Sequence, residues 1–464
     1  MGSGIVYEIA GVILWIFGAL FIYRIAIDTF GIVVQSKRFK KAKKQYKYAI
    51  IIPARNEAKV IAQLLHSIQK QDYPKDLIDV IVVAHNCTDN TAEIARQEGA
   101  TVFEYKSNGR RKGFAMRHAI NRIKKEYENG IYAYDGYIVF DADCIMAEDF
   151  VTEMNHAFNN KRYDMFTSYW NAKNTDMGLF SSWLTIKYLE TNCTERRPRS
   201  VLGISHAMNN AGVLFRNYLF EGSYRWLGLA DDMELSFDLV SSGYRNTYVT
   251  KAKLYTENPI HLKTLVTQYA RWRRGGIVAF FKYMFPLFFG IFLPTDFNRR
   301  RKPSQTHKEK WYMKPVIGFQ KRYSCFDLFI LFFPLWVLSF FMFLVYPVYI
   351  IVYYATTNNA DVMPNLIQLG IFFGIQYIQF FILTLLILIR ENKNVRCSGK
   401  IFLYIFMWPI INISMYEFVA FGSLVYPSKW GHKPVPRFDT REIEQVHEIK
   451  QIKEYIGGKH DDKL

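Results

Sequence analysis

The hydropathy pattern contains long runs without a charged residue. These runs are Ile9 to Tyr23, Leu328 to Ala355, Leu366 to Ile389 and Ile401 to Tyr416. A helix needs roughly 20 apolar residues to cross the core of a bilayer. The pattern therefore predicts a transmembrane helix within 1–35 and an α-helical transmembrane domain within 326–425. No basic residue precedes the first run, which favours a retained signal-anchor over a cleaved signal peptide.

Basic residues beside these runs predict how the chain is oriented. Seven Lys and Arg residues and no acidic residue lie within 37–47, and a second basic group lies within 291–322. Loops rich in Lys and Arg remain on the cytoplasmic side of a membrane. We therefore expect a multi-pass protein of the plasma membrane, with the region between the two basic groups in the cytoplasm.

The segment that joins this region to the later apolar runs is less regular. Its apolar part, 277–293, is short and is interrupted by Lys282 and Pro286. This favours an interfacial helix followed by a basic linker, together covering 277–320. Residues 426–464 are predicted as a basic and charged tail. For the last apolar run, a full span and a re-entrant helix both remain open.

From residue 48 to residue 275 the pattern changes to short apolar strands that alternate with amphipathic helices. The predicted strands are 48–52, 78–83, 101–104 and 137–140, and the predicted helices are 60–70, 91–98 and 114–127. This alternation is typical of a Rossmann-like α/β domain with a mixed, mostly parallel sheet. Ligands bind such sheets at the carboxyl ends of the strands.

Two acidic residues follow the last of these strands in the motif Asp141-Ala-Asp143. In an extended chain they point to the same side and their carboxylates converge. Converging carboxylates suit a hard cation such as Mg²⁺ or Mn²⁺, which keeps positions for substrate phosphates. A solvated turn is the alternative for so short a motif. The sequence contains no Gly-x-x-x-x-Gly-Lys loop, which argues against an ordinary ATPase.

A second acidic group lies at the start of a predicted helix that ends at Gly243. It contains Asp231, Asp232 and Glu234. Carboxylates are favoured at helix N-termini, so capping alone explains one of them. An adjacent pair is more than capping requires, and one member can act as a general base.

The third motif is Gln268-x-x-Arg271-Trp272, whose residues share one helical face. An Arg can bind a diphosphate with two parallel hydrogen bonds, and a Trp can stack on a sugar ring. A basic helix at a membrane surface is the alternative.

Composition limits the classes of protein that fit. The net charge is +18, aromatic residues make up 17% and there are 5 Cys. Disordered chains contain few aromatic residues, and small disulfide scaffolds contain many more Cys. A basic chain can bind nucleic acid, but much of this charge flanks apolar runs, where it determines topology and contacts anionic lipid. We therefore expect membrane lipids, and no nucleic acid, as partners.

Together and in this order, the three motifs resemble those of the inverting family-2 glycosyltransferases. The resemblance covers 48–275 by motif and the apolar runs by arrangement. It is closest to the membrane-embedded cellulose, hyaluronan, chitin and poly-N-acetylglucosamine synthases. It implies a GT-A-like domain, a nucleotide-diphospho-sugar donor, expected to be a UDP-sugar, and Mg²⁺ or Mn²⁺ as cofactor.

The resemblance also implies roles for individual residues. The donor nucleotide and its diphosphate are assigned to Pro53, Arg55, Glu57, His85, Asp89, Lys112, Asp141 and Arg271. The metal is assigned to Asp143 and Asp141, the catalytic base to Asp232, and the acceptor to Trp272, Gln268 and Asp231. His85 departs from the pattern, because the family usually has Asp there. Ala230-Asp231 replaces Thr-Glu, a change that keeps an acid.

The reaction implied by the resemblance is inverting. Asp232 deprotonates an acceptor hydroxyl, which attacks the anomeric carbon from the face opposite the diphosphate. The favoured function is processive extension of a β-linked polysaccharide with export across the membrane. Transfer of one sugar to a lipid or lipid-linked acceptor is an alternative, and a catalytically inactive membrane transporter or scaffold is another. The expected partners are the nucleotide sugar and a growing glycan or lipid acceptor; a homo-oligomer is possible.

Overall fold

The computed structural model describes residues 18–20, 22–109, 111–209, 211–293, 314–333, 348, 351–352, 355–356, 363–392, 394, 405–407 and 409–411. The predicted tail at 426–464 and most of the predicted basic linker, 294–313, lie outside the described residues. Large parts of the apolar runs lie outside them too. The predicted α/β region is described almost completely.

Eight strands of the described chain form one sheet in the order β3-β2-β1-β4-β7-β6-β8-β5. They are β1 (Tyr48–Ala54), β2 (Ile78–His85), β3 (Thr101–Tyr105), β4 (Gly136–Val139), β5 (Ile145–Met146), β6 (Met165–Ala172), β7 (Val213–Arg216) and β8 (Asn246–Thr256). The pairs β1–β2, β1–β4, β2–β3 and β6–β8 are parallel, whereas β4–β7, β6–β7 and β5–β8 are antiparallel. The predicted mixed, mostly parallel sheet is confirmed.

Apolar residues of β1 are buried on both faces of the sheet. Ile50 and Ile52 belong to one apolar cluster, and Ala49 and Ile51 belong to another. Two-sided burial explains why the parallel strands have continuous apolar sequences. Because Ile51 pairs with Val139, β1 and β4 end at the same edge of the sheet. This register brings the chain after β4 next to the loop after β1.

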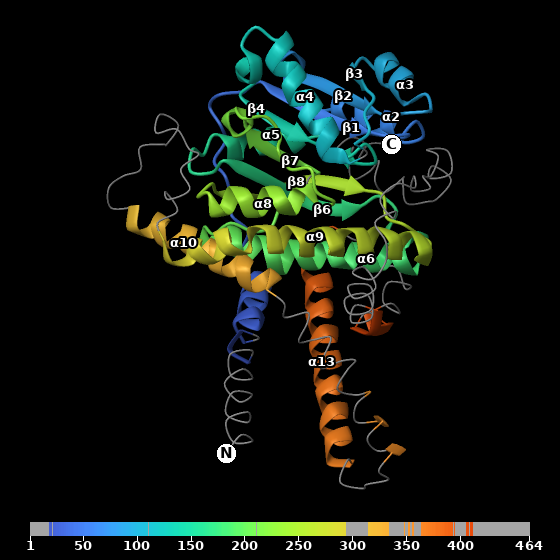
Figure 1. Cartoon of the computed structure of the whole chain (residues 1–464), viewed down its shortest axis with the longest axis vertical. Helices are drawn as coiled ribbons and strands as arrows, with labels where there is room; N and C mark the ends of the chain where they lie inside the picture. Colours follow the sequence, from blue (N-terminus) through green and yellow to red (C-terminus); the bar gives the residue numbers. More distant parts are fainter. Residues whose placement is uncertain are drawn as a thin grey trace, which may run out of the picture.

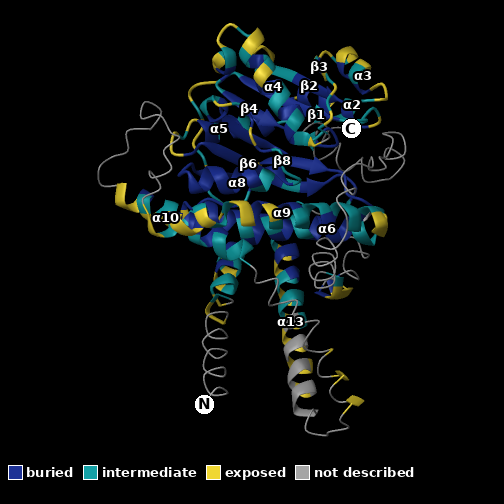
Figure 2. Ribbon diagram, viewed as in Figure 1, coloured by how far each residue is buried: buried dark blue, intermediate teal, exposed yellow. Residues whose placement is uncertain are grey.

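Helices cover both faces of this sheet (Figure 1). They are α2 (Ile61–Gln69), α3 (Thr91–Gln97), α4 (Lys112–Glu126), α5 (Phe150–Phe158), α6 (Leu179–Glu190), α7 (Arg197–Leu202), α8 (Asp231–Ser241), α9 (Leu262–Phe292), α10 (Lys314–Phe332) and α13 (Met363–Arg390). A π-helical segment, Thr191–Arg196, joins α6 to α7. Figure 2 shows the sheet as the most buried part of the molecule.

Helix α9 lies along the base of the α/β domain (Figure 1). It continues from Leu262 to Phe292, so the domain boundary predicted at 275–277 falls inside a helix. Among the described helices, α9 is long and apolar enough to cross a membrane, a criterion that core helices of soluble proteins also meet. The helical residues 22–33 and α13 project away from the same base.

Candidate functional site

A cavity of about 360 Å³ lies at the carboxyl ends of the central strands. Its walls come from the loops after β1 and β4, from the ends of β6 and β8, and from helices α4, α6, α8 and α9. The predicted site residues that line it are Pro53, Glu57, Lys112, Asp141, Asp143, Asp231, Asp232, Gln268, Arg271 and Trp272. Residues from every predicted motif therefore meet in one cavity.

The segment from Asp141 to Asp143 is a turn, so its predicted extended conformation is wrong. The turn is closed by the amide of Cys144, which donates to the carbonyl of Asp141 at 3.2 Å. Both carboxyl side chains still line the cavity. The side chain of Asp141 is 43% exposed, whereas Asp143 is buried.

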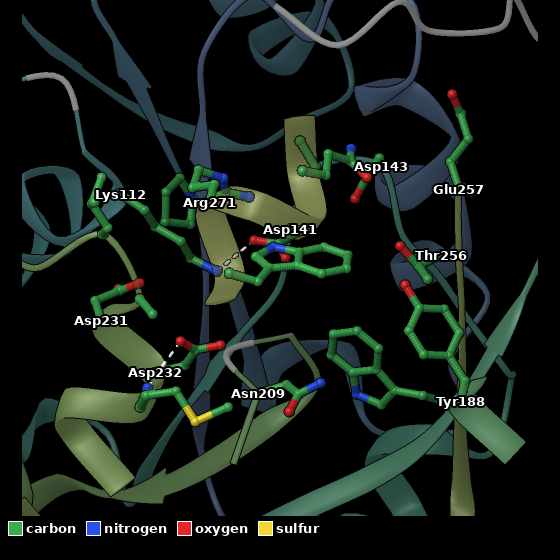
Figure 3. Close-up of a pocket in the computed structure, with 18 of the residues that line it drawn as sticks. Lys112, Asp141, Asp143, Tyr188, Asn209, Asp231, Asp232, Thr256, Glu257 and Arg271 are labelled. Carbon is green, nitrogen blue, oxygen red and sulfur yellow. Dashed lines mark hydrogen bonds and ion pairs between the residues drawn. The ribbon is translucent and has the colours of Figure 1, made fainter. Parts of the chain in front are cut away.

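Lys112 connects the two acidic groups of the cavity. Its ammonium group forms an ion pair with Asp141, as Figure 3 shows. Burial alone would lower the pKa of Lys112, but the nearby carboxylates of Asp141 and Asp231 raise it above its usual value. A permanent positive charge at this position suits a diphosphate leaving group.

Gly113 follows Lys112 at the start of α4 and lies in a close contact between this helix and the loop before α8. A Cβ at this position would lie 2.2 Å from the carbonyl oxygen of Trp226. Only glycine therefore allows α4 to pack against the loop before α8. This close approach keeps Lys112 beside the N-terminus of α8.

The two adjacent acids at the start of α8 have different surroundings. Asp231 is buried and accepts a hydrogen bond from the Tyr224 hydroxyl at 2.8 Å. Asp232 accepts one from the Met233 amide at 2.9 Å. Burial and the neighbouring Asp231 raise the pKa of Asp232 to about 7. Asp232 is therefore suited to accept a proton near neutral pH, while Asp231 is held by Tyr224.

Helix α9 presents Gln268, Arg271 and Trp272 to the cavity, as the spacing of these residues predicts. The helix approaches the start of α8 closely because position 275 is glycine. A Cβ there would lie 2.6 Å from the Cβ of Ala230. The glycine contact thus places the motif of α9 opposite the acids of α8.

Three residues assigned to the nucleotide do not line the cavity: Arg55, His85 and Asp89. His85 is buried, where its ring stacks on Tyr105 and bonds to Ser107 at 3.1 Å. Asp89 accepts hydrogen bonds from the amides of Thr91 and Ala58 and so joins the loops after β1 and β2. These two residues support the loops in the structure, and the predicted nucleotide contacts of all three stay predictions.

Several residues that line the cavity have no predicted role in the site. They are Trp170, Tyr188, Asn209, Thr256 and Glu257. None of them belongs to one of the three motifs. From the sequence alone, Trp170 is interpreted either as a platform for a sugar ring or as a core residue. In Figure 3, Tyr188, Thr256 and Glu257 lie on the side of the cavity opposite Lys112 and Asp231.

The side chains in the cavity fit a divalent cation bound together with substrate. In the described ranges, no three His, Cys, Asp or Glu side chains come together as a metal site. Asp141 and Asp143 nevertheless both line the cavity, and two carboxylates leave coordination positions for phosphate oxygens. Oxygen ligands of this kind suit Mg²⁺ or Mn²⁺, which bind partly through substrate phosphates. They do not suit a metal whose ligands all come from the protein.

Comparison with known sequences identifies related proteins. Part of the chain is 43% identical over 95 residues to 4,4'-diaponeurosporenoate glycosyltransferase from Staphylococcus aureus. The match spans 20% of this chain and 23% of that protein, so the chain covers less than a quarter of the curated relative's length.

Comparison with solved structures identifies the fold. The mannosyltransferase PcManGT from Pyrobaculum calidifontis, solved in complex with GDP-Man and Mn²⁺, superposes with a TM-score of 0.51 and 14% identity. The superposition covers 89% of this chain and 96% of that protein. At this level of identity the likeness shows a shared GT-A-like fold and nothing about substrate. The sequence from residue 45 to residue 275 matches the family described as glycosyltransferase like family 2, and this part of the chain is therefore a glycosyltransferase family 2 domain.

Proposed function

We propose that the protein is a metal-dependent, inverting glycosyltransferase that transfers a sugar from a nucleotide diphosphate, expected to be a UDP-sugar, to an acceptor hydroxyl. The observation that carries the proposal is the composition of the cavity. Asp141 and Asp143 supply two carboxylates, Lys112 and Arg271 supply positive charge, and Asp232 supplies a base. These groups match, one by one, the requirements of displacing a nucleoside diphosphate.

The positive residues stabilise the leaving group in this proposal. Charge develops on the diphosphate as its bond to the sugar breaks. Lys112 and Arg271 line the same cavity, and Lys112 stays protonated because carboxylates surround it. Asp141 and Asp143 would hold a Mg²⁺ or Mn²⁺ ion, which as a Lewis acid supplies further positive charge to the diphosphate.

Asp232 acts as the general base. Its raised pKa makes it a better proton acceptor than an ordinary Asp, yet it is ionised in a large fraction of molecules near neutral pH. Removal of the hydroxyl proton lets the acceptor oxygen attack the anomeric carbon from the face opposite the diphosphate. Trp272 and Gln268 line the cavity and are assigned to the acceptor.

We propose a membrane location and a growing β-linked polysaccharide as the acceptor, extended processively and exported. The supporting observations are the projecting helices at 22–33 and α13, and the apolar side chains exposed on α9. The same exposed face favours a second candidate, a lipid or lipid-linked acceptor, because it would bring the site close to a bilayer. Product length on a sizing gel separates the two, since one predicts a polymer and the other a discrete glycolipid.

The proposed activity is tested with the purified full-length chain. Nucleotide release is measured over a panel of nucleotide sugars with Mg²⁺ or Mn²⁺, and again after EDTA. We expect release from one donor, its loss on chelation, and a drop of about 10²–10⁴-fold in Asp232→Asn. The exposed Asp76 offers a matched control, and Asp76→Asn should retain wild-type activity. Equal rates in Asp232→Asn and wild type would exclude Asp232 as the base.

A further inference from the structure

One wall of the cavity carries two aromatic rings that the proposed donor chemistry does not use. Trp170 lies near the end of β6, and Tyr188 lies on α6. The rings meet edge to face, with centroids 5.4 Å apart and an interplanar angle of 74°. Both line the cavity that contains Asp232. Tyr188 faces the cavity from the side opposite Lys112 (Figure 3).

The indole of Trp170 is held in place by the surrounding chain. Its Nε1 atom donates to the carbonyl oxygen of Ala211 at 3.1 Å. The backbone carbonyl oxygen of Trp170 accepts a hydrogen bond of 2.7 Å from the Asn192 side chain. Because the only donor of the ring is already bonded, the indole can offer a ligand its carbon surface. A ligand therefore contacts the indole by stacking on the ring and not by accepting a hydrogen bond from it.

Arg196 connects β6, which carries Trp170, to the π-helical segment that contains Asn192. Its guanidinium group is 5.4 Å from the Trp170 ring, and its Nη1 atom donates to the Ser168 carbonyl at 2.9 Å and to Asn192 at 3.2 Å. Arg196 is only 1% exposed. A buried charge is costly, and the π-helical segment that carries Arg196 and Asn192 belongs to a class often found at functional sites.

We propose that Trp170 and Tyr188 form an acceptor subsite for a pyranose ring, and that Arg196 is the residue that positions the indole. The acceptor is thus a carbohydrate. This inference rests on the proposed function and specifies the class of its acceptor. Aromatic surface stacks on the C–H face of a sugar. Asn209 and Thr256 line the same cavity and provide polar groups for ring hydroxyls.

Acceptor kinetics test this subsite in the full-length protein. Cellobiose and N,N'-diacetylchitobiose serve as probes, and their stimulation of nucleotide release gives the acceptor KM. We expect Trp170→Ala to raise that KM about tenfold, as the loss of one stacking contact predicts. The donor KM should not change, and Trp170→Phe should retain most of the affinity. Tyr132→Ala removes an exposed aromatic ring elsewhere and should have no effect.

The positioning role of Arg196 needs a separate readout. Arg196→Met keeps much of the volume and removes the charge, and it should raise the acceptor KM with little change in the donor KM. Arg196→Lys should restore part of the affinity. A uniform loss of folded protein and of all kinetic constants would show that Arg196 is only structural.

Three kinetic results would each overturn the subsite. The acceptor KM of Trp170→Ala could stay within twofold of wild type, its donor KM could rise equally, or a long-chain alcohol could stimulate release where neither disaccharide does. Calorimetric titration of the disaccharides separates this proposal from the proposed function, because binding needs no turnover. Binding that depends on Trp170 in a protein without turnover would support the subsite and refute the enzymatic proposal. Absence of binding to wild type would refute the subsite.

Discussion

At the scale of single residues, the site depends on how burial changes neighbouring charges. Asp231 and Asp232 are adjacent in sequence, but only Asp231 bonds to Tyr224. Burial raises the pKa of both carboxyls, and Asp231 adds to the rise at Asp232. The sequence predicts an acidic pair at a helix start, yet it cannot say which member is held by the protein. The Tyr224 contact distinguishes them.

If Asp232 is the base, as we propose, its pKa determines the pH dependence of the reaction. A general base works only when ionised, and here the pKa is raised to about 7. We expect kcat/KM to rise with pH through a value near 7 rather than near the ordinary Asp value. A pH–rate profile of the wild type checks this, and an ascending limb centred near pH 4 would contradict it.

The same shift predicts a stability effect for Asp232→Asn. Between pH 3.8, the ordinary pKa of an Asp, and about pH 7, the raised pKa of Asp232, the folded state retains a proton that the unfolded state releases. Stability contributed by this group is therefore lost as the pH rises through that window. We expect Asp232→Asn to unfold at a higher temperature than wild type at pH 8, with little difference at pH 3.5. Thermal unfolding at the two pH values measures it.

At the scale of elements, glycines determine how closely the helices around the site approach. Gly113 lets α4 pack on the loop at Trp226, and Gly275 lets α9 pack on Ala230. Each contact lies near a residue that lines the cavity, Lys112 in one case and Trp272 in the other. The spacing of a motif predicts which residues share a helix face. It does not predict how near that face comes to a second helix.

Neighbouring glycines in α9 provide a matched test. In Gly275→Ala the new Cβ would lie 2.6 Å from the Cβ of Ala230, whereas at Gly276 nothing lies within 4 Å. We expect Gly275→Ala to lower kcat/KM by about tenfold or more, because about 1 Å of displacement can cost 10²-fold. Gly276→Ala should keep its activity and gain up to about 1 kcal/mol of stability, since Ala favours helix. Equal activity in the two variants would refute the proposed contact.

At the scale of the whole molecule, buried ion pairs join the α/β domain to the helices at its base. Arg199 of α7 forms two contacts with Asp327 of α10, at 2.5 and 2.9 Å. Arg197 pairs at 2.5 Å with Glu391, which follows α13. These residues lie far apart in the sequence, so no local pattern predicts their pairing. The pairs orient α10 and α13 relative to the α/β domain.

Breaking the Arg199–Asp327 pair should destabilise the protein strongly. Both side chains are at most 1% exposed, so Asp327→Ala leaves a buried charge without its partner. We expect a loss of about 3–5 kcal/mol. The exposed Arg122–Glu126 pair is the control, and Glu126→Gln should cost no more than about 1 kcal/mol. Thermal inactivation half-lives in detergent compare the variants, and equal half-lives would contradict the prediction.

The sequence by itself determined the parallel half of the sheet and the residues of the three motifs. Continuous Ile and Val runs specify β1 and β2 because both faces of these strands are buried. Strands β5 to β8 were not predicted. Strands β5 and β7 have only 2 and 4 residues, and β7 pairs antiparallel with β4 and β6, which are distant from it in the sequence. Only the tertiary structure decided the turn at Asp141–Asp143, the aromatic wall at Trp170 and the separate environments of Asp231 and Asp232. Each depends on contacts between segments far apart in the chain, which local spacing does not encode.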